Sequence, residues 1–582
     1  MVIQQARRWL NNFFGEHEDM YMAGVAVLIG VAAGYGNIIF RYMISFVQDF
    51  FYGTKEEFLL ETLIHTPVYK IVLIPALGGL IVGMVGLIFK SAKGHGVPDV
   101  IKVIALNLKI SPFVAVVKSF TSAVTLGTGG SAGREGPIIH IGAALGSGVG
   151  KIFSFSSRRM KTALACGAAG GLAATFNAPI GGAMFAAEVL LGEFGIRTFS
   201  PIIISSVIAT VVSRGHLGNV VTFNVPEYHL RHFMELPLYM VLGFACAVVG
   251  VFFIRFFYKT EETFDNLKMP SFLKPALGGL LLGILAIFSR EIMGVGYDTI
   301  NQILASNQVG LFLILIVFLK ILATSLTLGS GGAGGLFVPA LFIGAATGGA
   351  LGGIFNTAFP GITSSSGAYA LVAMSAMLGA TIRAPLTAIL IIFEITQNYE
   401  IILPLMFATI IANVAANWLE KESIFSWILA KEGINIKKGA EEGILSEIKV
   451  EDVMLRDIVT FKETSNFKEI IEGIKEADHI YYPVLDDGGY LTGMMSLDNI
   501  KSVMFEKELE EIVVAGEICT KDNIIYVYPE DNLSTGMKKM GIKDLGALPV
   551  VEKVNGKHRV VGLLRRSDII LAYNKALATQ SG

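Results

Sequence analysis

The chain contains little charge and little cysteine. Charged residues make up 16% of its 582 positions, against 53% hydrophobic residues. Soluble domains carry about 25% charged residues, so the composition excludes a chain that is soluble throughout. The three cysteines, Cys166, Cys246 and Cys519, show no paired spacing, which argues against a disulfide framework and against a zinc site.

Signatures of several other protein classes are also missing. The net charge is −2 and there is no basic cluster, so nucleic acid is not an expected partner. The glycine-rich segments are not followed by Gly-Lys-Ser/Thr, and no aspartate stands at the spacing of a dinucleotide-binding fold. We therefore do not expect an enzyme. In place of a signal peptide, Arg7, Arg8 and Trp9 before Phe13 predict an amphipathic interfacial helix on the cytoplasmic side.

The charge that is present gathers at one end of the chain. Of the 94 Asp, Glu, Lys and Arg residues, 46 lie from Lys431 onward. This predicts an integral, multi-pass membrane domain over residues 1–430, embedded in the lipid bilayer, then a linker at 431–448 and a soluble tail at 449–582. If the tail is cytoplasmic like the N-terminus, the number of complete crossings is even.

Apolar stretches of two kinds alternate in the first 430 residues. The strong ones lie near 21–48, 67–90, 236–258, 273–288, 309–328, 366–380 and 399–418. Shorter ones, interrupted by glycine or proline, lie near 113–126, 137–150, 162–175, 179–191, 337–354 and 385–396. Broken helices at membrane depth are tolerated where they pack in protein or line a water-filled path. The pattern predicts half-crossing helices whose ends meet near the midplane.

One phrase occurs twice, 202 residues apart. Residues 126–137 read LGTGGSAGREGP, and residues 328–339 read LGSGGAGGLFVP. Each copy is a glycine-rich loop that leads into an apolar stretch. Such a loop presents backbone N–H groups at a helix N-terminus, where proteins hold anions. The two copies predict one anion site between two related halves, roughly residues 20–215 and 235–420.

A second pair of motifs supports the duplication. Residues 176–180 read FNAPI and residues 382–386 read IRAPL, and in each copy a glutamate follows nine residues after the proline, Glu188 or Glu394. Structural repeats with the substrate site where they meet are a recurring plan of membrane transport proteins. The order and spacing of these motifs therefore predict a transport protein.

Glu135 is the exceptional residue of the first loop, because Phe337 takes its place in the second. A carboxylate at the bilayer centre costs about 2.5–3.5 kcal/mol on insertion scales and marks a functional position. Where an anion should bind, an ionised Glu135 competes with that anion and a protonated one moves aside. The structural alternative is an ion pair with Arg134 or solvation at a helix end.

The tail contains a repeat of its own. Residues 449–512 and 513–582 share the order of their β-rich and helical pieces, and the β-rich pieces include Ile480–Tyr482 and Ile524–Val527. The pattern resembles a pair of CBS domains, a module that is often attached to transporters and enzymes.

Three motifs resemble the anion-binding signatures of the CLC family of chloride channels and transporters. They are Gly94-His95-Gly96-Val97-Pro98, Gly133-Arg134-Glu135-Gly136-Pro137 and Gly335-Leu336-Phe337-Val338-Pro339. The similarity covers nearly the whole chain, CBS pair included. It implies an all-α polytopic membrane domain of two inverted repeats, with about 18 helical segments, many of them broken, followed by an α/β cytoplasmic CBS pair.

The resemblance also implies roles for particular residues. Chloride is the implied substrate, and the implied assembly is a homodimer with a separate anion pathway in each subunit. Glu135 is implied to be the gating glutamate at the external anion site, with the N–H groups of Leu336 and Phe337 on the central ion. The other residues implied to form the anion site are Gly94, His95, Gly96, Gly133, Arg134, Gly136, Gly335 and Val338.

Two departures from the family pattern concern the anion path. His95 stands where well-known members carry a serine whose hydroxyl touches the central anion. An imidazole donates hydrogen bonds and titrates near neutral pH, so His95 either binds anions or senses pH, or else points away and leaves backbone contacts alone. Phe425 stands in place of a tyrosine ligand in the last membrane helix. It lacks the hydroxyl, which predicts a looser or purely steric inner gate.

A third departure concerns the proton pathway. Proton-coupled members commonly carry a Phe-x-x-Glu-Glu pattern, whereas residues 185–189 read FAAEV here. Val189 occupies the proton-handling position and cannot relay a proton, which resembles the channel branch of the family. Glu188 either substitutes for the missing acid or is a structural residue mirrored by Glu394, and the structural role is the favoured interpretation.

The CBS pair carries an incomplete version of the family's adenosine-binding pattern. That pattern places Ser or Thr three residues after a glycine and Asp six residues after it. The first copy has Ser496 but Asn499, and the second has Arg565 but Asp568. Two interpretations stay open: an adenine nucleotide bound by Ser496, Asn499, Thr520 and Asp568, or a scaffold for dimerisation and gating.

These patterns favour a passive, voltage- or pH-gated chloride channel of the cell membrane. A chloride/proton antiporter of the same family is the main alternative, and a fluoride exchanger is a variant of it. A CBS-regulated cation transporter would belong to a different class and would need clustered carboxylates at membrane depth. Outside Glu135, Glu188 and Glu394 the apolar segments supply almost none, so we expect no metal site.

Overall fold

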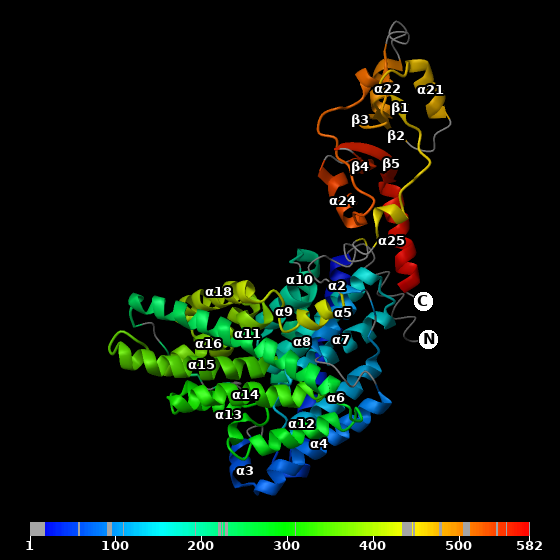
Figure 1. Ribbon diagram of the computed structural model, residues 1–582. Coiled ribbons are helices and arrows are strands. Elements are labelled where there is room, and N and C mark those ends of the chain that lie inside the picture. The colour runs from blue at the N-terminus through cyan, green and yellow to red at the C-terminus, as the bar shows by residue number, and fades with distance from the viewer. Residues whose placement is uncertain are drawn as a thin grey trace. The chain divides into compact units, whose positions relative to one another are not determined.

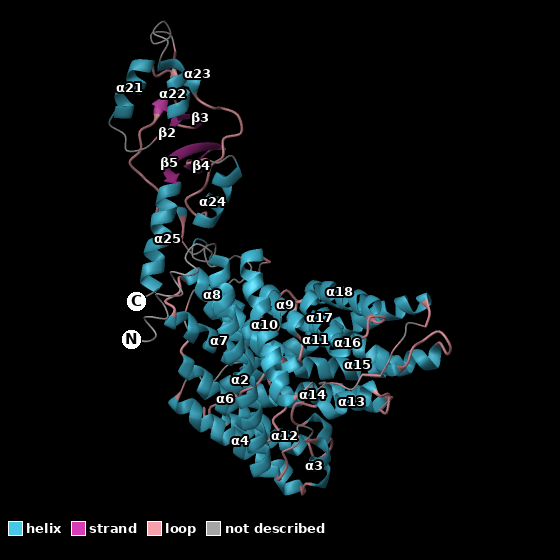
Figure 2. Ribbon diagram, turned by 180° about the vertical axis from the view of Figure 1, so that it is seen from behind, coloured by secondary structure: helices cyan, strands magenta, loops and turns pink. Residues whose placement is uncertain are grey.

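The computed structural model divides into two compact units, Met1–Ile434 and Asn435–Gly582. It describes residues 18–580 except for the following positions: 56–58, 90–95, 107, 109, 193, 219–222, 224, 227, 229–230, 309, 434–444, 446–447, 476–479, 505–512, 543–544 and 555. Figure 2 shows helices throughout the first unit and strands in the second.

The described part of the membrane unit contains eighteen α-helices, α2 to α19 (Figure 1). The first half holds α2 (Glu18–Tyr52), α3 (Leu60–His65), α4 (Val68–Ile88), α5 (Val97–Ala105), α6 (Pro112–Gly127), α7 (Glu135–Ile152), α8 (Ser157–Phe176), α9 (Pro179–Phe185), the π-helix η2 (Ala186–Leu191) and α10 (Ile196–Leu217). The second half holds the 3-10 turn η3 (Phe233–Glu235), α11 (Leu236–Asn266), α12 (Lys274–Leu285), the 3-10 turn η4 (Arg290–Ile292), α13 (Tyr297–Leu304), α14 (Leu311–Gly329), α15 (Phe337–Ala358), α16 (Ser366–Ile382), α17 (Pro385–Thr396), α18 (Ile402–Leu419) and α19 (Ser426–Lys431).

Among the described residues, seven helices are long and apolar enough to cross a membrane, and five further apolar helices have 10–17 residues. One of the seven, within α10, has no counterpart among the apolar stretches identified in the sequence. Its apolar run is interrupted by Pro201 and by the adjacent serines Ser205 and Ser206, which are both buried. Ser205 donates to the carbonyl of Cys166 on α8 at 2.8 Å, so its hydroxyl is satisfied inside the bundle.

The two halves cross at α4 and α12, which lie side by side in both views (Figures 1 and 2). Both helices contain the sequence PALGGL at the crossing, starting at Pro75 in α4 and at Pro275 in α12. A Cβ on Gly79 would lie 2.1 Å from the carbonyl oxygen of Pro275, and a Cβ on Gly279 would lie 2.2 Å from that of Pro75. Only glycine fits this close, two-fold-like contact between backbones.

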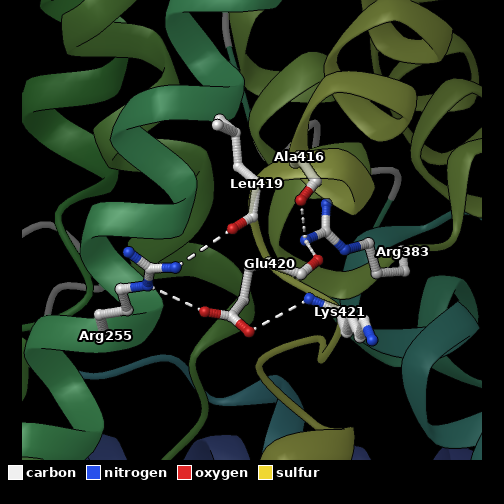
Figure 3. A network of polar contacts seen from close by, with 6 residues as sticks. All are labelled: Arg255, Arg383, Ala416, Leu419, Glu420 and Lys421. Carbon is white, nitrogen blue, oxygen red and sulfur yellow. Dashed lines mark hydrogen bonds and ion pairs between the residues drawn. The ribbon is translucent and has the colours of Figure 1, made fainter.

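Equivalent residues cap the helices α8 and α16 at their C-terminal ends. Asn177 follows α8 and Arg383 follows α16, both in the left-handed conformation, with φ of 58° and 64°. Arg383 donates to the carbonyl oxygens of Ala416, at 2.7 Å, and Glu420, at 3.2 Å (Figure 3). A cation at the C-terminal end of α18 is favourable because the helix dipole is negative there.

Arg255 of α11 joins the same network (Figure 3). Its Nε lies 2.9 Å from Glu420 Oε2, and its second guanidinium nitrogen donates to the carbonyl of Leu419 at 3.1 Å. The network therefore ties α11, α16 and α18 together immediately before the segment that carries Phe425.

The described residues of the tail unit form two small sheets. The first has the order β1 (Phe461–Lys462), β2 (Tyr481–Leu485) and β3 (Leu491–Ser496), with β1 and β2 parallel and β2 and β3 antiparallel. The second pairs β4 (Ala547–Val554) with β5 (Lys557–Arg565) in antiparallel fashion. The helices are α21 (Phe467–Lys475), α22 (Leu497–Met504), α23 (Ala515–Ile518), α24 (Leu533–Ile542) and α25 (Arg566–Gln580).

The β-rich piece predicted at Ile524–Val527 does not form a strand. Only Val527 pairs, through a parallel bridge to Val550. Val527 is fully buried and belongs to the core of the second domain, so the segment contributes an apolar anchor where its composition predicted a strand.

Candidate functional site

The two glycine-rich loops meet in the middle of the membrane unit. Gly133 N donates to Gly335 O at 2.8 Å, and Gly335 N donates to Gly133 O at 2.7 Å. This reciprocal pair is an isolated antiparallel bridge between the two repeats. The loops that the sequence predicted to share one site are therefore joined directly.

Two threonines hold the loops from either side, and the sequence interpretation missed both of them. Thr327 Oγ1 accepts from Ser131 N at 3.1 Å, and Thr125 Oγ1 accepts from Ala333 N at 3.2 Å. Thr125 and Thr327 lie 202 residues apart, the same offset as the repeated phrase. Extending the comparison of the two copies upstream by one residue would have identified them.

Glu135 places its carboxylate at the N-terminus of the opposite repeat's helix. Its Oε1 accepts from Phe337 N at 2.6 Å and from Val338 N at 3.1 Å, which are the first two residues of α15. The side chain is fully buried, and Oε2 has no hydrogen-bond partner among the described residues. The carboxylate thus sits where the N–H groups of α15 would hold an anion.

The surroundings of the carboxylate are tight and mostly apolar. A Cβ on Gly133 or on Gly335 would lie within 2.4 Å of a Glu135 carboxylate oxygen. The Phe337 ring is buried, with its centroid 5.4 Å from that of Phe176. Leu336, Val338 and Gly136 are buried as well.

Arg134 lies close by but is directed to other partners. Its guanidinium carbon stands 5.1 Å from the centroid of the Tyr297 ring, and a guanidinium nitrogen lies 3.5 Å from the carbonyl oxygen of Thr175. Both hydrogen bonds to Glu135 Oε1 come from the backbone of α15.

The third signature loop is described in part. Gly94 and His95 lie outside the described residues, so the proposed roles of His95 stay predictions. Gly96 has φ +79° and stands directly before α5. A Cβ on it would lie 2.5 Å from the carbonyl oxygen of Gly136, so this loop packs against the residue that follows Glu135.

Phe425 is buried at the start of α19, after an anchored segment. Ile424 N donates to Thr381 O at 2.9 Å, and the Tyr258 hydroxyl donates to Ile424 O at 2.5 Å. These contacts fix the backbone of Ile424, the residue directly before Phe425. Its function as an inner gate stays a prediction.

Glu188 and Glu394 each cap the N-terminus of a helix in the opposite repeat. Glu188 Oε2 accepts from the N–H of Thr387, at 2.7 Å, and from its hydroxyl, at 2.7 Å, at the N-terminus of α17. Glu394 accepts from Ile180 N at 2.9 Å and from Gly181 N at 2.6 Å, at the N-terminus of α9. Val189 follows within the π-helix η2 and is half-buried. Glu188 is therefore engaged as a helix cap.

In the tail, the residues of the incomplete adenosine pattern bond to one another. Asn499 Oδ1 accepts from the Ser496 hydroxyl at 2.6 Å. Both carboxylate oxygens of Asp568 accept from the Arg565 guanidinium at 2.8 Å. Thr520 exchanges backbone hydrogen bonds with Met494.

No cluster of three or more His, Cys, Asp or Glu side chains suited to a metal occurs within the described ranges.

Comparison with known proteins places these features in one family. Residues 77–417 match the family described as voltage gated chloride channel. Residues 450–506 and 515–575 each match the CBS domain.

Individual proteins show the same likeness. The chain is 31% identical to chloride channel protein CLC-f of Arabidopsis thaliana, over 94% of this chain and 79% of that protein. Its structure is similar to that of a slow cyanobacterial Cl⁻/H⁺ antiporter, with a TM-score of 0.64 and 26% identity over 71% of this chain and 97% of that one. A eukaryotic CLC transporter shares the fold at a TM-score of 0.63 and 18% identity, over 98% of this chain and 99% of that one.

Proposed function

This chain belongs to the voltage gated chloride channel family, and we propose that it is a passive chloride channel whose pathway is gated by Glu135. As a family member with a CBS pair, it is an integral, multi-pass membrane protein that transports chloride. The proposal goes beyond this in three points: Glu135 gates the pathway, chloride transport is passive, and the protein forms a homodimer.

One observation supports the proposal that Glu135 is the gate. The Glu135 carboxylate accepts two hydrogen bonds from the first turn of α15 and is buried between both repeats. A chloride ion needs the same N–H groups, so the carboxylate and the ion compete for one place. Protonation removes the negative charge and weakens the hold of α15 on the side chain, which frees the place for chloride.

The missing inner acid supports a passive mechanism. Val189 has no titratable atom, and Glu188 is engaged with the N–H and the hydroxyl of Thr387. A proton passing through this region finds no acidic side chain at position 189. The carboxylate at position 188 already accepts hydrogen bonds from Thr387. This arrangement supports the proposal that chloride flows without obligatory proton counterflow.

A chloride/proton antiporter is the second candidate, and a specific observation favours it. With the carboxylate in place the anion site is filled and the side chain is buried, which suits a mechanism that alternates between proton and anion. The similar cyanobacterial structure is that of an antiporter. A fluoride exchanger would be a variant of this candidate.

Reconstitution into vesicles with separate chloride and pH gradients distinguishes the two. A channel gives a reversal potential at the chloride equilibrium value that does not move when a pH gradient is imposed. An antiporter gives a reversal potential that shifts with the pH gradient and drives protons uphill when chloride runs down its gradient. Protein with Glu135→Ala serves as the uncoupled reference in both cases.

We further propose a homodimer with one pathway per subunit. Exposed apolar side chains line α17 and α18, including Leu386, Leu403, Phe407, Ile410 and Val414, and such a surface suits either lipid or a second subunit. Counting fluorophore bleaching steps on single labelled particles tests the assembly. Two steps support the dimer, and one step contradicts it.

The tail is proposed to be a cytoplasmic scaffold rather than a nucleotide sensor. Asp568 is bound by Arg565, and Asn499 is bound by Ser496, so an adenosine would have to displace contacts that already exist. Digestion of sealed right-side-out vesicles by external protease tests the location. A cytoplasmic tail stays intact until the vesicles are opened.

A further inference from the structure

Lys320 is buried in the middle of α14 and has no acidic partner among the described residues. Its Nζ donates to the carbonyl oxygens of Ile292, at 3.0 Å, and Gly294, at 3.1 Å. It also lies 4.7 Å from the centroid of the Phe342 ring. A lysine ammonium has three donors, and an aromatic face attracts a cation. The backbone carbonyls and the ring therefore hold this side chain in place of a carboxylate.

The two carbonyls belong to residues 292–297, which connect η4 with α13. This segment is also joined to the first glycine-rich loop, because Gly294 N donates to Gly129 O at 2.9 Å. A Cβ on Gly296 would lie 3.4 Å from Lys320 Nζ and 2.7 Å from the phenyl ring beneath that amine. The segment thus passes close to the lysine and is fixed at both of the carbonyls that the lysine binds.

The segment ends at the aromatic ring on which Arg134 rests. Tyr297 is the first residue of α13 and is buried. Its ring packs edge-on against that of Phe223, with centroids 5.3 Å apart, and the Arg134 guanidinium carbon stands 5.1 Å from its centroid. Arg134 directly precedes Glu135, and it is the charged residue that acts on the Glu135 carboxylate in the described part of the chain. A chain of contacts therefore leads from Lys320 to the charge beside the anion site.

The two repeats use the same lysine position differently. Lys118 stands 202 residues before Lys320, and His140 stands 202 residues before Phe342. In the first repeat Lys118 Nζ lies 3.3 Å from Asp99 Oδ2, and His140 Nδ1 lies 4.0 Å from the same oxygen. The first lysine thus pairs with a carboxylate, whereas the second binds backbone carbonyls.

We propose that Lys320 is a positioning residue of the anion site. By fixing residues 292–297 it holds the Tyr297 ring beneath Arg134. The Arg134 charge then stays beside the place for which Glu135 and chloride compete. Without the lysine, two buried carbonyls would lose a donor, which is costly, so the segment would shift and Arg134 would shift with it. This inference rests on the proposed anion pathway and adds a residue that acts through Arg134.

The first test measures equilibrium binding of bromide to the purified full-length protein by titration calorimetry at pH 7. All proteins carry Glu135→Gln, so that the carboxylate does not compete with bromide. Lys320→Met removes the donors and keeps an apolar chain over the Phe342 ring, whereas Lys320→Arg keeps donors for both carbonyls. Arg134→Gln removes the charge through which the lysine is proposed to act.

We expect bromide to bind several-fold to about tenfold more weakly in Lys320→Met, and as in the reference protein in Lys320→Arg. Adding Lys320→Met to Arg134→Gln should weaken binding no further, because both changes act through one charge. The inference is overturned if Lys320→Met binds bromide as the reference protein does. It is also overturned if the two losses add, since the lysine would then act independently of Arg134.

A control separates positioning from a general loss of stability. Gly79→Ala disturbs the packing of α4 against α12 and should leave bromide affinity unchanged. If Lys320→Met does not fold, Lys320→Gln takes its place with the same expectations, because its amide stands on a chain one bond shorter and does not reach both carbonyls.

A second measurement separates this inference from the proposed function. Chloride flux is recorded over pH 5 to 8 in proteins that keep Glu135. An opposite charge nearby favours the ionised form of a carboxylate, so a displaced Arg134 should let protonation, and with it flux, begin at a higher pH. We expect the pH of half-maximal flux to rise by about 0.5–1 unit in Lys320→Met and to stay unchanged in Lys320→Arg.

The outcomes distinguish the two claims. Chloride flux with a midpoint that Lys320→Met does not move overturns the inference and leaves the channel standing. If bromide binding responds to Lys320 as expected and no chloride flux occurs in any of the proteins, the proposed channel fails and the positioning role survives.

Discussion

Glu135 and Phe337 occupy the same place in the two copies of the repeated loop, and the carboxylate of the first accepts a hydrogen bond of 2.6 Å from the backbone N–H of the second. The duplication thus produces an asymmetric pair from equivalent positions. One repeat supplies a buried carboxylate, and the other supplies the helix N-terminus that donates hydrogen bonds to it. The loops themselves stay symmetric through the reciprocal bonds of Gly133 and Gly335.

Replacing Glu135 by alanine should leave chloride flux and remove its dependence on the pH of the Glu135 face. The reason is that the competitor for the α15 N–H groups is absent at every pH. Flux assays in vesicles over pH 5 to 8 measure this. Glu235→Gln is the control, because this second buried glutamate accepts from Ser364 and Tyr369 and should keep the pH response. Retained pH dependence in Glu135→Ala would contradict the gate.

The two capping glutamates should behave alike. Glu188→Gln and Glu394→Gln each weaken charge-assisted hydrogen bonds to a helix N-terminus, and we expect each to cost about 1–3 kcal/mol in the free energy of unfolding. Thermal unfolding in detergent measures the loss. Chloride selectivity and the reversal potential should be unchanged in both. A loss of proton-dependent flux in Glu188→Gln alone would instead assign Glu188 to a proton pathway.

The crossing of α4 and α12 should not tolerate a methyl group. Gly79→Ala places a Cβ within 2.1 Å of the Pro275 carbonyl oxygen, which should cost about 1–3 kcal/mol through backbone displacement. Gly353→Ala on α15 meets no atom within 4 Å and is the matched control, expected to be neutral or slightly stabilising. Equal melting temperatures for the two variants would show that the crossing is looser than described.

The tail should not respond to adenine nucleotides. Arg565 holds Asp568 with two hydrogen bonds of 2.8 Å, so the acid that would bind a ribose is occupied. We expect no change in the melting temperature of the full-length protein with about 1 mM ATP, AMP or adenosine. A shift that Asp568→Asn abolishes would show that nucleotide displaces Arg565.

The sequence predicted that the two glycine-rich loops meet and that Glu188 and Glu394 are equivalent, because these signals are local. The repeated loops, the broken helices and the pairing of Glu188 with Glu394 all lie in short motifs at a nearly constant offset. A comparison of longer stretches of the two halves also finds the PALGGL repeat at Pro75 and Pro275 and the pair Thr125 and Thr327. The sequence interpretation missed both.

Other features could not be read from local patterns. Helix α10 contains Pro201 and buried serines, and two of these serines, Ser205 and Ser213, donate to carbonyl oxygens of α8. The meeting of Asp99, Lys118 and His140 depends on how three separate helices pack. The direction of the Glu135 side chain, toward α15 and with Arg134 over Tyr297, likewise follows from tertiary structure.

Anomalous diffraction from bromide-soaked crystals tests the central claim most directly, by comparing the unmodified protein with Glu135→Gln. The account predicts a bromide peak within hydrogen-bonding distance of Phe337 N and Val338 N in the variant, and a weaker peak or none at that position in the unmodified protein. A peak of equal height there in both proteins, or no peak there in the variant, would show that the carboxylate and the halide do not share a place.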